Sequence, residues 1–271
     1  MTPNSMRQLN KAKASPGIQV KALFMDYDGT ISPINVPKSE SSVPQETSVV
    51  LNKIGKQIPI AIVTTKSLQF VFGRTPFAHA WSALGGLETR IGNVTTKART
   101  IEYESEHLTV ALSHSRDVSD GGLTIEEKCD SEGRIVAFSV DWRQCEDCNK
   151  AKAAALKLLS FCETLSIFVI RYKGQPFFDV FAYPIDKGKA LVELKEGLGL
   201  NDGVLYMGDS TADNSAFELA DFSVGVVHSE TPKELACDYF IKFEDVPVFL
   251  KGLLENGLQF DPGFSMVTHA K

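Results

Sequence analysis

The chain has 271 residues, of which 43% are apolar and 23% charged, and a formal net charge of −6. The length predicts one large or two modest domains. The absence of a basic stretch argues against a nucleic-acid partner, and no run approaches the roughly 20 apolar residues of a membrane span. Five cysteines, an odd number, are not typical of a disulfide framework, so we expect a cytoplasmic protein in a reducing compartment.

The first predicted strand ends in a pair of acids. Residues 1–18 are polar, lack the apolar core of a signal peptide and predict a flexible N-terminal tail. The apolar run at 20–25 that follows has the length and composition of a buried parallel strand, and Asp26 and Asp28 come directly after it. Two acids at a strand end ionise together cheaply only around a cation. The stretch indicates a metal-assisted site with a carboxylate nucleophile, or alternatively an Asp-rich turn that closes the strand.

The next elements predict a parallel sheet. Apolar residues at helical spacing predict a helix at 45–57, and a second buried strand is predicted at 59–63. Thr64 and Thr65 follow that strand. A third strand at 80–84 completes a βαβαβ pattern, which is typical of a parallel sheet with right-handed crossovers.

The character of the sequence changes from residue 87 to residue 182. Antiparallel hairpins combined with helices predict an α+β unit here. The predicted elements are strands at 100–103, 124–129, 134–142, 166–172 and 176–182 and a helix at 149–162.

The parallel pattern then resumes and predicts an α/β fold: a doubly wound, Rossmann-like parallel-sheet core with an inserted α+β unit. The predicted elements are helices at 187–198, 212–219, 231–236 and 245–256 and strands at 203–207, 222–227 and 239–242. The predicted boundaries are 19–86 and 183–257 for the core, 87–182 for the inserted unit and 258–271 for a C-terminal tail.

Polar residues at strand ends and helix starts converge at one edge of such a sheet. We expect Asp26 to be the nucleophile and a metal ligand, with Lys187 and the Thr64 hydroxyl holding phosphoryl oxygens. Asp209 would complete the oxygen shell that Mg²⁺ prefers. Asp213, one helical turn further on, would bind a metal-bound water or orient Lys187.

Asp28 has a separate role in this interpretation. Next to the nucleophile, it would protonate the leaving alcohol and then activate water for the second step. Two acids with different roles suit a two-step transfer, and the partner would be a small-molecule phosphate ester.

Four motifs carry a resemblance to a known family. They stand in the order of the haloacid dehalogenase-like phosphatases and resemble the motifs of that family. They are Asp26-Tyr27-Asp28-Gly29-Thr30, Thr64, Lys187-Gly188 and Gly208-Asp209-Ser210-Thr211-Ala212-Asp213. The short interval between the first two leaves no room for a cap domain. The long interval between Thr64 and Lys187 matches the type-two cap of the αβ variety, called IIB.

The resemblance implies a magnesium ion held by Asp26, Asp209 and the backbone carbonyl of Asp28, with Asp213 behind this ligand set. It also implies a phosphate site formed by the loop after the first strand, the second motif and the third motif. The residues implied for phosphate binding are Gly29, Thr30, Thr64, Thr65 and Lys187.

Within this superfamily, residues 206–217 are most similar to the trehalose-6-phosphate phosphatases and related sugar-phosphate phosphatases. The resemblance implies sugar contacts from the cap at Arg143 and Asp179. Two departures concern the substrate: Lys66 stands where the family usually has Arg, and an Arg often found near Asp179 is absent. Phosphoglycolate, a glycosyl-phosphoglycerate and a nucleotide therefore stay open as alternative substrates.

Other patterns point to less specific roles. A non-catalytic module that binds a sugar phosphate is a second hypothesis, although Asp26 and Asp28 would repel an anion in a pure binder. Cys145 and Cys148 have redox or metal spacing but no second ligand pair, which favours a structural or incidental role. The five histidines are scattered and form no recognisable triad. The sequence gives no indication of the oligomeric state.

Overall fold

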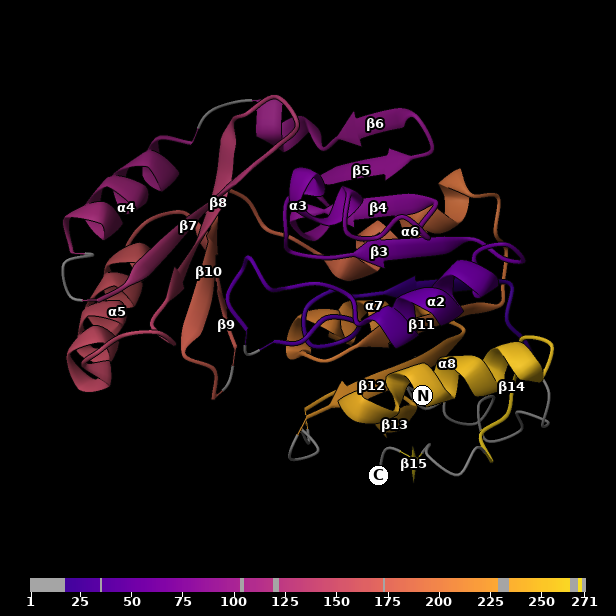
Figure 1. The fold of residues 1–271 in the computed structure, drawn as a ribbon. Helices are drawn as coiled ribbons and strands as arrows, with labels where there is room; N and C mark the ends of the chain where they lie inside the picture. The colour runs from indigo at the N-terminus through magenta and orange to yellow at the C-terminus, as the bar shows by residue number, and fades with distance from the viewer. Residues whose placement is uncertain are drawn as a thin grey trace, which may run out of the picture.

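A nine-stranded sheet forms the larger part of the molecule (Figure 1). The structure is a computed structural model that describes residues 18–34, 36–102, 105–118, 122–172, 174–228, 234–263 and 268–269. Across the sheet the strands are β15 (Thr268–His269), β13 (Tyr239–Lys242), β12 (Phe222–Val227), β11 (Val204–Gly208), β2 (Ala22–Met25), β3 (Ile60–Val63), β4 (Ala80–Ala83), β5 (Glu88–Ile91) and β6 (Val94–Lys97).

The strands from β13 to β4 run parallel, and their central members are apolar along their whole length. Every residue of β2, β3 and β11 is buried. Such continuous burial requires cover on both faces of the sheet. Helices supply it in two sets: α2 (Gln45–Ile54), α3 (Leu68–Phe72) and α8 (Val246–Glu255) on one face, and α6 (Lys187–Gly197) and α7 (Asn214–Leu219) on the other. The predicted doubly wound α/β core is confirmed.

A smaller antiparallel sheet stands beside the large one (Figure 1). Its strands, in order, are β7 (Thr124–Cys129), β8 (Ile135–Asp141), β10 (Phe177–Phe181) and β9 (Phe168–Arg171). Two helices, α4 (Glu106–Asp117) and α5 (Cys148–Glu163), pack on its outer face around the fully buried Phe138 and Val180. The other face looks toward the carboxyl ends of β2, β3 and β11, since residues of both sheets line one cleft there.

The structure corrects the predicted start of the inserted unit. Residues 88–97, placed in that unit from the sequence, form the hairpin β5–β6 and extend the large sheet from β4. The strand predicted at 100–103 is wrong, because Arg99–Glu102 form a 3-10 helix. This hairpin was not predicted, because the side chains of Val94–Lys97 are largely exposed and show no clear apolar alternation. The helix α4 was not predicted either.

The predicted C-terminal tail also needs a correction. Gln259–Phe260 form β14, which pairs with β1 (Ile18–Gln19), and Phe260 is buried in the large core. The helix predicted at 231–236 lies largely outside the described residues, and so do residues 1–17 of the predicted N-terminal tail. Among the described residues, no helix combines the length and apolar character required to cross a membrane.

A cluster of charges ties the β5–β6 hairpin to the turn between β7 and β8. The Lys97 ammonium lies 3.0 Å from the fully buried carboxylate of Asp130 and 4.0 Å from that of Glu88. Glu88 in turn accepts a hydrogen bond from the Ser131 amide at 2.9 Å. Asp130 also pairs with the Arg134 guanidinium at 3.0 Å, so Lys97 is shared between an acid that has a second cation and the buried Glu88.

Replacing this ammonium should destabilise the fold. We expect Lys97→Met to lower the free energy of unfolding by about 3 kcal/mol, because Glu88 would remain buried without a cation and Asp130 would keep only Arg134. Urea unfolding followed by circular dichroism measures the loss. Lys251→Met, which removes an exposed i,i+4 pair with Glu255, is the control and should change stability by less than about 0.5 kcal/mol. Equal effects of the two variants would contradict the account.

Candidate active site

A cleft of about 570 Å³ lies between the two sheets, at the carboxyl ends of the parallel strands. Most of the residues predicted from the sequence line it. They are Asp26, Asp28, Thr64, Thr65, Lys187 and Asp209 from the core and Arg143 and Asp179 from the smaller sheet. Gly29 and Asp213 lie behind this lining, against Asp209 and Lys187 respectively. Thr30 instead lines a separate, smaller pocket with Pro44, Thr47 and Phe243.

Asp26 occupies the centre of the site because β2 ends at Met25. Its amide donates to the Met207 carbonyl of β11 at 2.9 Å, which fixes the backbone between the two central strands. Its side chain is 7% exposed and faces the cleft. The Lys187 ammonium lies 3.0 Å from its Oδ2 atom.

Lys187 reaches this position from the first residue of α6. The carboxylate of Asp186 caps the helix by accepting from the Gly188 and Lys189 amides. Burial alone would lower the pKa of Lys187, but Asp213 and Asp26 outweigh it and raise the pKa above its usual value. The ammonium therefore stays charged beside Asp26.

Asp213 holds Lys187 and has little capacity left for other partners. Its Oδ1 lies 2.7 Å from the Lys187 ammonium and accepts from the Tyr206 hydroxyl at 2.7 Å. Its Oδ2 accepts from the Ser210 amide at 3.0 Å and hydroxyl at 3.1 Å. Each oxygen thus has two donors, and the contacts suit the predicted role of orienting Lys187.

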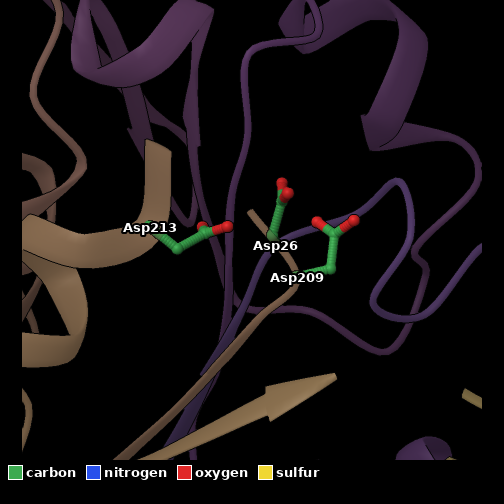
Figure 2. Close-up of side chains that lie close together, drawn as sticks. All are labelled: Asp26, Asp209 and Asp213. Atoms are coloured by element: carbon green, nitrogen blue, oxygen red, sulfur yellow. The ribbon is translucent and has the colours of Figure 1, made fainter. Parts of the chain in front are cut away.

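Asp26, Asp209 and Asp213 bring their carboxylates together, with oxygens within 4.8 Å of one another (Figure 2). Burial and the negative charge of Asp213 raise the pKa of Asp26 to about 7, although Lys187 opposes the shift. Burial and the charge of Asp26 likewise raise the pKa of Asp209 well above its usual value. Carboxylates crowded in this way are the donor set that a divalent cation stabilises.

The backbone around Asp209 leaves room for these acids only because glycine is present. Gly29 has a φ of +74°, and a Cβ atom there would lie 2.1 Å from Asp209 Oδ2. The Gly29 carbonyl is also 2.9 Å from His228 Nε2, which stacks on Phe243. Asp26 and Asp209 can therefore point into the same space, and the site fits a divalent cation such as Mg²⁺.

Asp28 lies at the rim of this cluster and is held by polar contacts from two directions. The Ser41 hydroxyl donates to its Oδ1 at 3.2 Å, and the Lys66 ammonium is 3.5 Å from its Oδ2. Lys66 also lies 3.7 Å from Glu126 of the smaller sheet. Burial alone would lower the pKa of Lys66, but Asp28 and Glu126 outweigh it and raise the pKa above its usual value. Lys66 therefore stays charged and connects Asp28 of the core to Glu126 of the smaller sheet.

The hydroxyl groups at the ends of β2 and β3 are buried, and one of them has no partner. The Thr64 hydroxyl accepts from the Lys66 amide at 3.2 Å, which leaves its own proton free to donate. The Thr30 hydroxyl is fully buried, and no described residue hydrogen-bonds with it. The Thr64 hydroxyl lines the same cleft as Lys187, and a free donor there suits an anion with several oxygens.

Polar side chains at alternate positions of the smaller sheet form the opposite wall. Glu126, Ser139 and Asp179 are paired directly across β7, β8 and β10. The Lys128 ammonium lies 2.8 Å from Asp179, and the Tyr172 hydroxyl donates to Asp179 at 2.9 Å. Burial would raise the pKa of Asp179, but Lys128 and Ser139 outweigh it and lower the pKa below its usual value.

Arg143 borders the same wall and contacts the core. Its guanidinium pairs with Asp141, lies 4.7 Å from the centre of the Phe177 ring and donates to the Ile34 carbonyl of the core. Arg143 and Asp179 both line the cleft, but Asp179 already has its own cation, whereas Arg143 bridges the two sheets.

Comparison with curated proteins finds relatives along nearly the whole chain. Trehalose 6-phosphate phosphatase RA3 of Zea mays is 25% identical over 275 residues, which cover 93% of this chain and 74% of the relative. The probable trehalose-phosphate phosphatase I of Arabidopsis thaliana is 27% identical over 266 residues, covering 90% and 69%. A search of known family models finds no match.

Solved structures agree with these relatives. The C-terminal domain of the C. albicans trehalose-6-phosphate phosphatase aligns with a TM-score of 0.72 at 18% identity, covering 94% of this chain and 98% of that one. A sugar phosphatase of haloacid dehalogenase subclass IIB aligns with a TM-score of 0.57 at 16% identity, covering 88% and 100%. The chain is similar in sequence to trehalose-phosphate phosphatases, and it shares its fold with these two solved structures. The resemblance drawn from the four motifs is confirmed.

Several residues of this site were missed from the sequence. Tyr206 and His228 contact the carboxylate cluster, and Lys128 and Tyr172 contact Asp179. One signal was available for the wall, because polar residues alternate through 124, 126 and 128 and mark one face of β7. No comparable signal singles out His228, which lies at the end of a distant strand.

Because the carboxylates repel one another, we expect that replacing one of them by its amide will stabilise the metal-free protein. Asp209→Asn removes a buried charge, so the metal-free protein should gain about 1–3 kcal/mol of unfolding free energy at pH 8. Thermal unfolding with and without Mg²⁺ measures this gain. The variant should also lose the stabilisation that Mg²⁺ gives the wild type.

The pH dependence of stability tests the same crowding of carboxylates. Below about pH 4 the Asp26 carboxyl is protonated in both the folded and the unfolded state. Between its usual pKa of 3.8 and the folded value of about 7, it is protonated only in the folded state. Relative to Asp26→Asn, the metal-free wild type should therefore lose stability as the pH rises from about 4 to 7 and level off above. A flat difference across this range would contradict the account.

Proposed function

We propose that the chain is a Mg²⁺-dependent phosphatase that hydrolyses a sugar-phosphate monoester through an aspartyl-phosphate on Asp26. The observation that carries the proposal is the Asp26 carboxylate, which faces a polar cleft with the Lys187 ammonium at 3.0 Å. The curated relatives named as trehalose-phosphate phosphatases support this reaction class and suggest trehalose 6-phosphate as the first candidate substrate.

Asp26 is proposed as the nucleophile because its carboxylate faces the cleft and has the Lys187 ammonium beside it. Lys187 reduces the repulsion between its carboxylate and the incoming phosphoryl group. Asp213 keeps Lys187 in place through its own contact of 2.7 Å. The unused donor of Thr64, with the loop residues Gly29, Thr30 and Thr65, would bind the remaining phosphoryl oxygens.

Asp26, Asp209 and the backbone carbonyl of Asp28 would hold the magnesium ion. The ion supplies Lewis-acid stabilisation of charge on the phosphoryl oxygens. Asp213 belongs to the same carboxylate cluster, but its oxygens already have four donors. We therefore assign it the role of positioning Lys187.

Asp28 is proposed as the proton carrier of both steps. Lys66 and Ser41 hold its side chain at the mouth of the cleft. From there it would protonate the leaving alcohol as the Asp26–phosphorus bond forms. It would then take a proton from the water that attacks the aspartyl-phosphate.

The smaller sheet is proposed as a cap that binds the leaving group. Its wall combines acceptors and donors, among them Glu126, Lys128, Ser139 and Asp179. A hydroxyl-rich group such as a sugar satisfies paired donors and acceptors better than the two-carbon acid of phosphoglycolate does. A panel of phosphate esters should therefore show the highest kcat/KM for a disaccharide phosphate, and a preference for phosphoglycolate would redirect the proposal.

Replacement of the nucleophile tests the reaction directly. Asp26→Asn should lower phosphate release from an aryl phosphate or trehalose 6-phosphate by at least about 10³-fold, because the amide cannot accept the phosphoryl group. Circular dichroism should show an intact fold. Wild-type activity in this variant would contradict the proposal, and so would unchanged wild-type release after removal of Mg²⁺.

Lys66 should matter through the acid that it holds. Lys66→Met should lower kcat about tenfold, equivalent to about 1.4 kcal/mol, because Asp28 and Glu126 lose their shared cation. Lys66→Arg should recover part of that loss. Lys38→Met is the matched control, since Lys38 contacts Glu126 at 2.8 Å from an exposed position. If this control lowers kcat equally, the effect acts through Glu126 rather than Asp28.

A further inference from the structure

Cys145 and Cys148 lie in the segment that leads from β8 into α5. Cys145 is half-buried against the apolar core of the smaller sheet, and Cys148 is exposed at the first residue of the helix. The other cysteines are placed differently: Cys162 and Cys237 are buried. Burial raises the pKa of Cys162 to about 11, so its thiol stays protonated and inert.

The two cysteines of the pair are in contact. The Cys148 thiol donates to the Cys145 carbonyl at 3.7 Å. A hydrogen bond with the Cys148 thiol is the largest cause that raises the pKa of Cys145. Cysteines three residues apart, in a bend that enters a helix, can satisfy the short Cα separation that a disulfide requires.

The same segment is connected to the proposed active site. The Cys145 thiol donates to the Trp142 carbonyl at 2.8 Å, and the Trp142 amide donates to the Pro176 carbonyl at 3.0 Å. Arg143 and Gln144, which stand between Trp142 and Cys145, line the cleft. The guanidinium of Arg143 also contacts the Ile34 carbonyl of the core.

We propose that Cys145 and Cys148 form a reversible disulfide that moves the Trp142–Gln144 segment and thereby regulates the cleft. A disulfide sulfur carries no proton, so the Trp142 carbonyl loses its thiol donor when the bond forms. The bend also tightens as the two sulfurs become bonded. Both changes act next to Arg143.

The oxidant is a low-molecular-weight disulfide such as oxidised glutathione. The thiolate of the exposed Cys148 attacks one of its sulfurs, forms a mixed disulfide and releases one thiolate. The Cys145 thiolate then attacks the Cys148 sulfur and releases the second thiolate. The two cysteine protons pass to the released thiolates, so two cysteines are oxidised and one glutathione disulfide is reduced to two thiols.

The effect on catalysis rests on the proposed function. Arg143 connects the cap to the core, so its displacement weakens closure over the substrate while the core residues stay in place. Oxidation should therefore raise KM about fivefold and change kcat little. A dithiol reductant should restore the original KM.

Peptide mass mapping after equilibration with oxidised glutathione tests the site without any activity measurement. We expect a Cys145–Cys148 disulfide that dithiothreitol reverses, together with a change in Trp142 fluorescence. Trp81→Phe removes the other tryptophan signal. Cys148→Ser and Cys145→Ser should abolish both the bond and the fluorescence change, whereas Cys129→Ser should keep them.

The possible outcomes separate the two proposals. Absence of the bond at high oxidised glutathione would overturn the redox site, whatever the enzyme hydrolyses. A bond that leaves Trp142 fluorescence and KM unchanged would overturn the regulatory role. If the chain hydrolyses no ester, bond formation with a fluorescence change still supports the switch, and only the proposed function fails.

Discussion

The ion pair between Lys187 and its two acids is the interaction on which the site depends. Asp26 and Asp213 are both buried beside one ammonium group, at 3.0 and 2.7 Å. Without that cation the carboxylates would repel each other in a medium that solvates them poorly. With it, Asp26 is held facing the cleft, but its raised pKa indicates that its negative charge is incompletely compensated, and Asp209 increases the demand for a further cation. The arrangement carries a cost in stability that binding of a metal ion would offset.

The two sheets contribute different sides of the cleft. The parallel sheet places its polar residues at one edge because all its central strands end there, and this geometry brings together residues as distant as Asp26 and Lys187. The antiparallel sheet contributes a wall whose polar side chains alternate along β7 and pair across β8 and β10. Lys66 and Arg143 connect the two, so the position of the wall and the position of Asp28 are coupled.

Much of this could be predicted from the sequence, for physical reasons that differ by region. Buried parallel strands are continuous apolar runs, so β2, β3 and β11 and the acids after them were found. The β5–β6 hairpin was missed because its exposed polar residues resemble a loop. The contacts of Tyr206 and His228 depend on side-chain direction and on strand order, which one sequence does not encode locally. The cap wall was found only at Asp179 and Arg143, although the alternation along β7 was readable. The sequence predicts a structural or incidental role for Cys145 and Cys148, because the contact of Cys145 with Trp142 depends on the folded geometry.

Reductive trapping of the phosphoenzyme tests the central claim most directly. Borohydride converts an aspartyl-phosphate to homoserine. With an aryl phosphate, whose leaving group needs little protonation, Asp28→Asn should make the intermediate accumulate by slowing its hydrolysis. Peptide mapping after rapid mixing of this variant with Mg²⁺ and substrate should find homoserine at position 26, and only when both are present. Homoserine at another carboxylate, or none while phosphate is released, would contradict the assignment of Asp26 as the nucleophile.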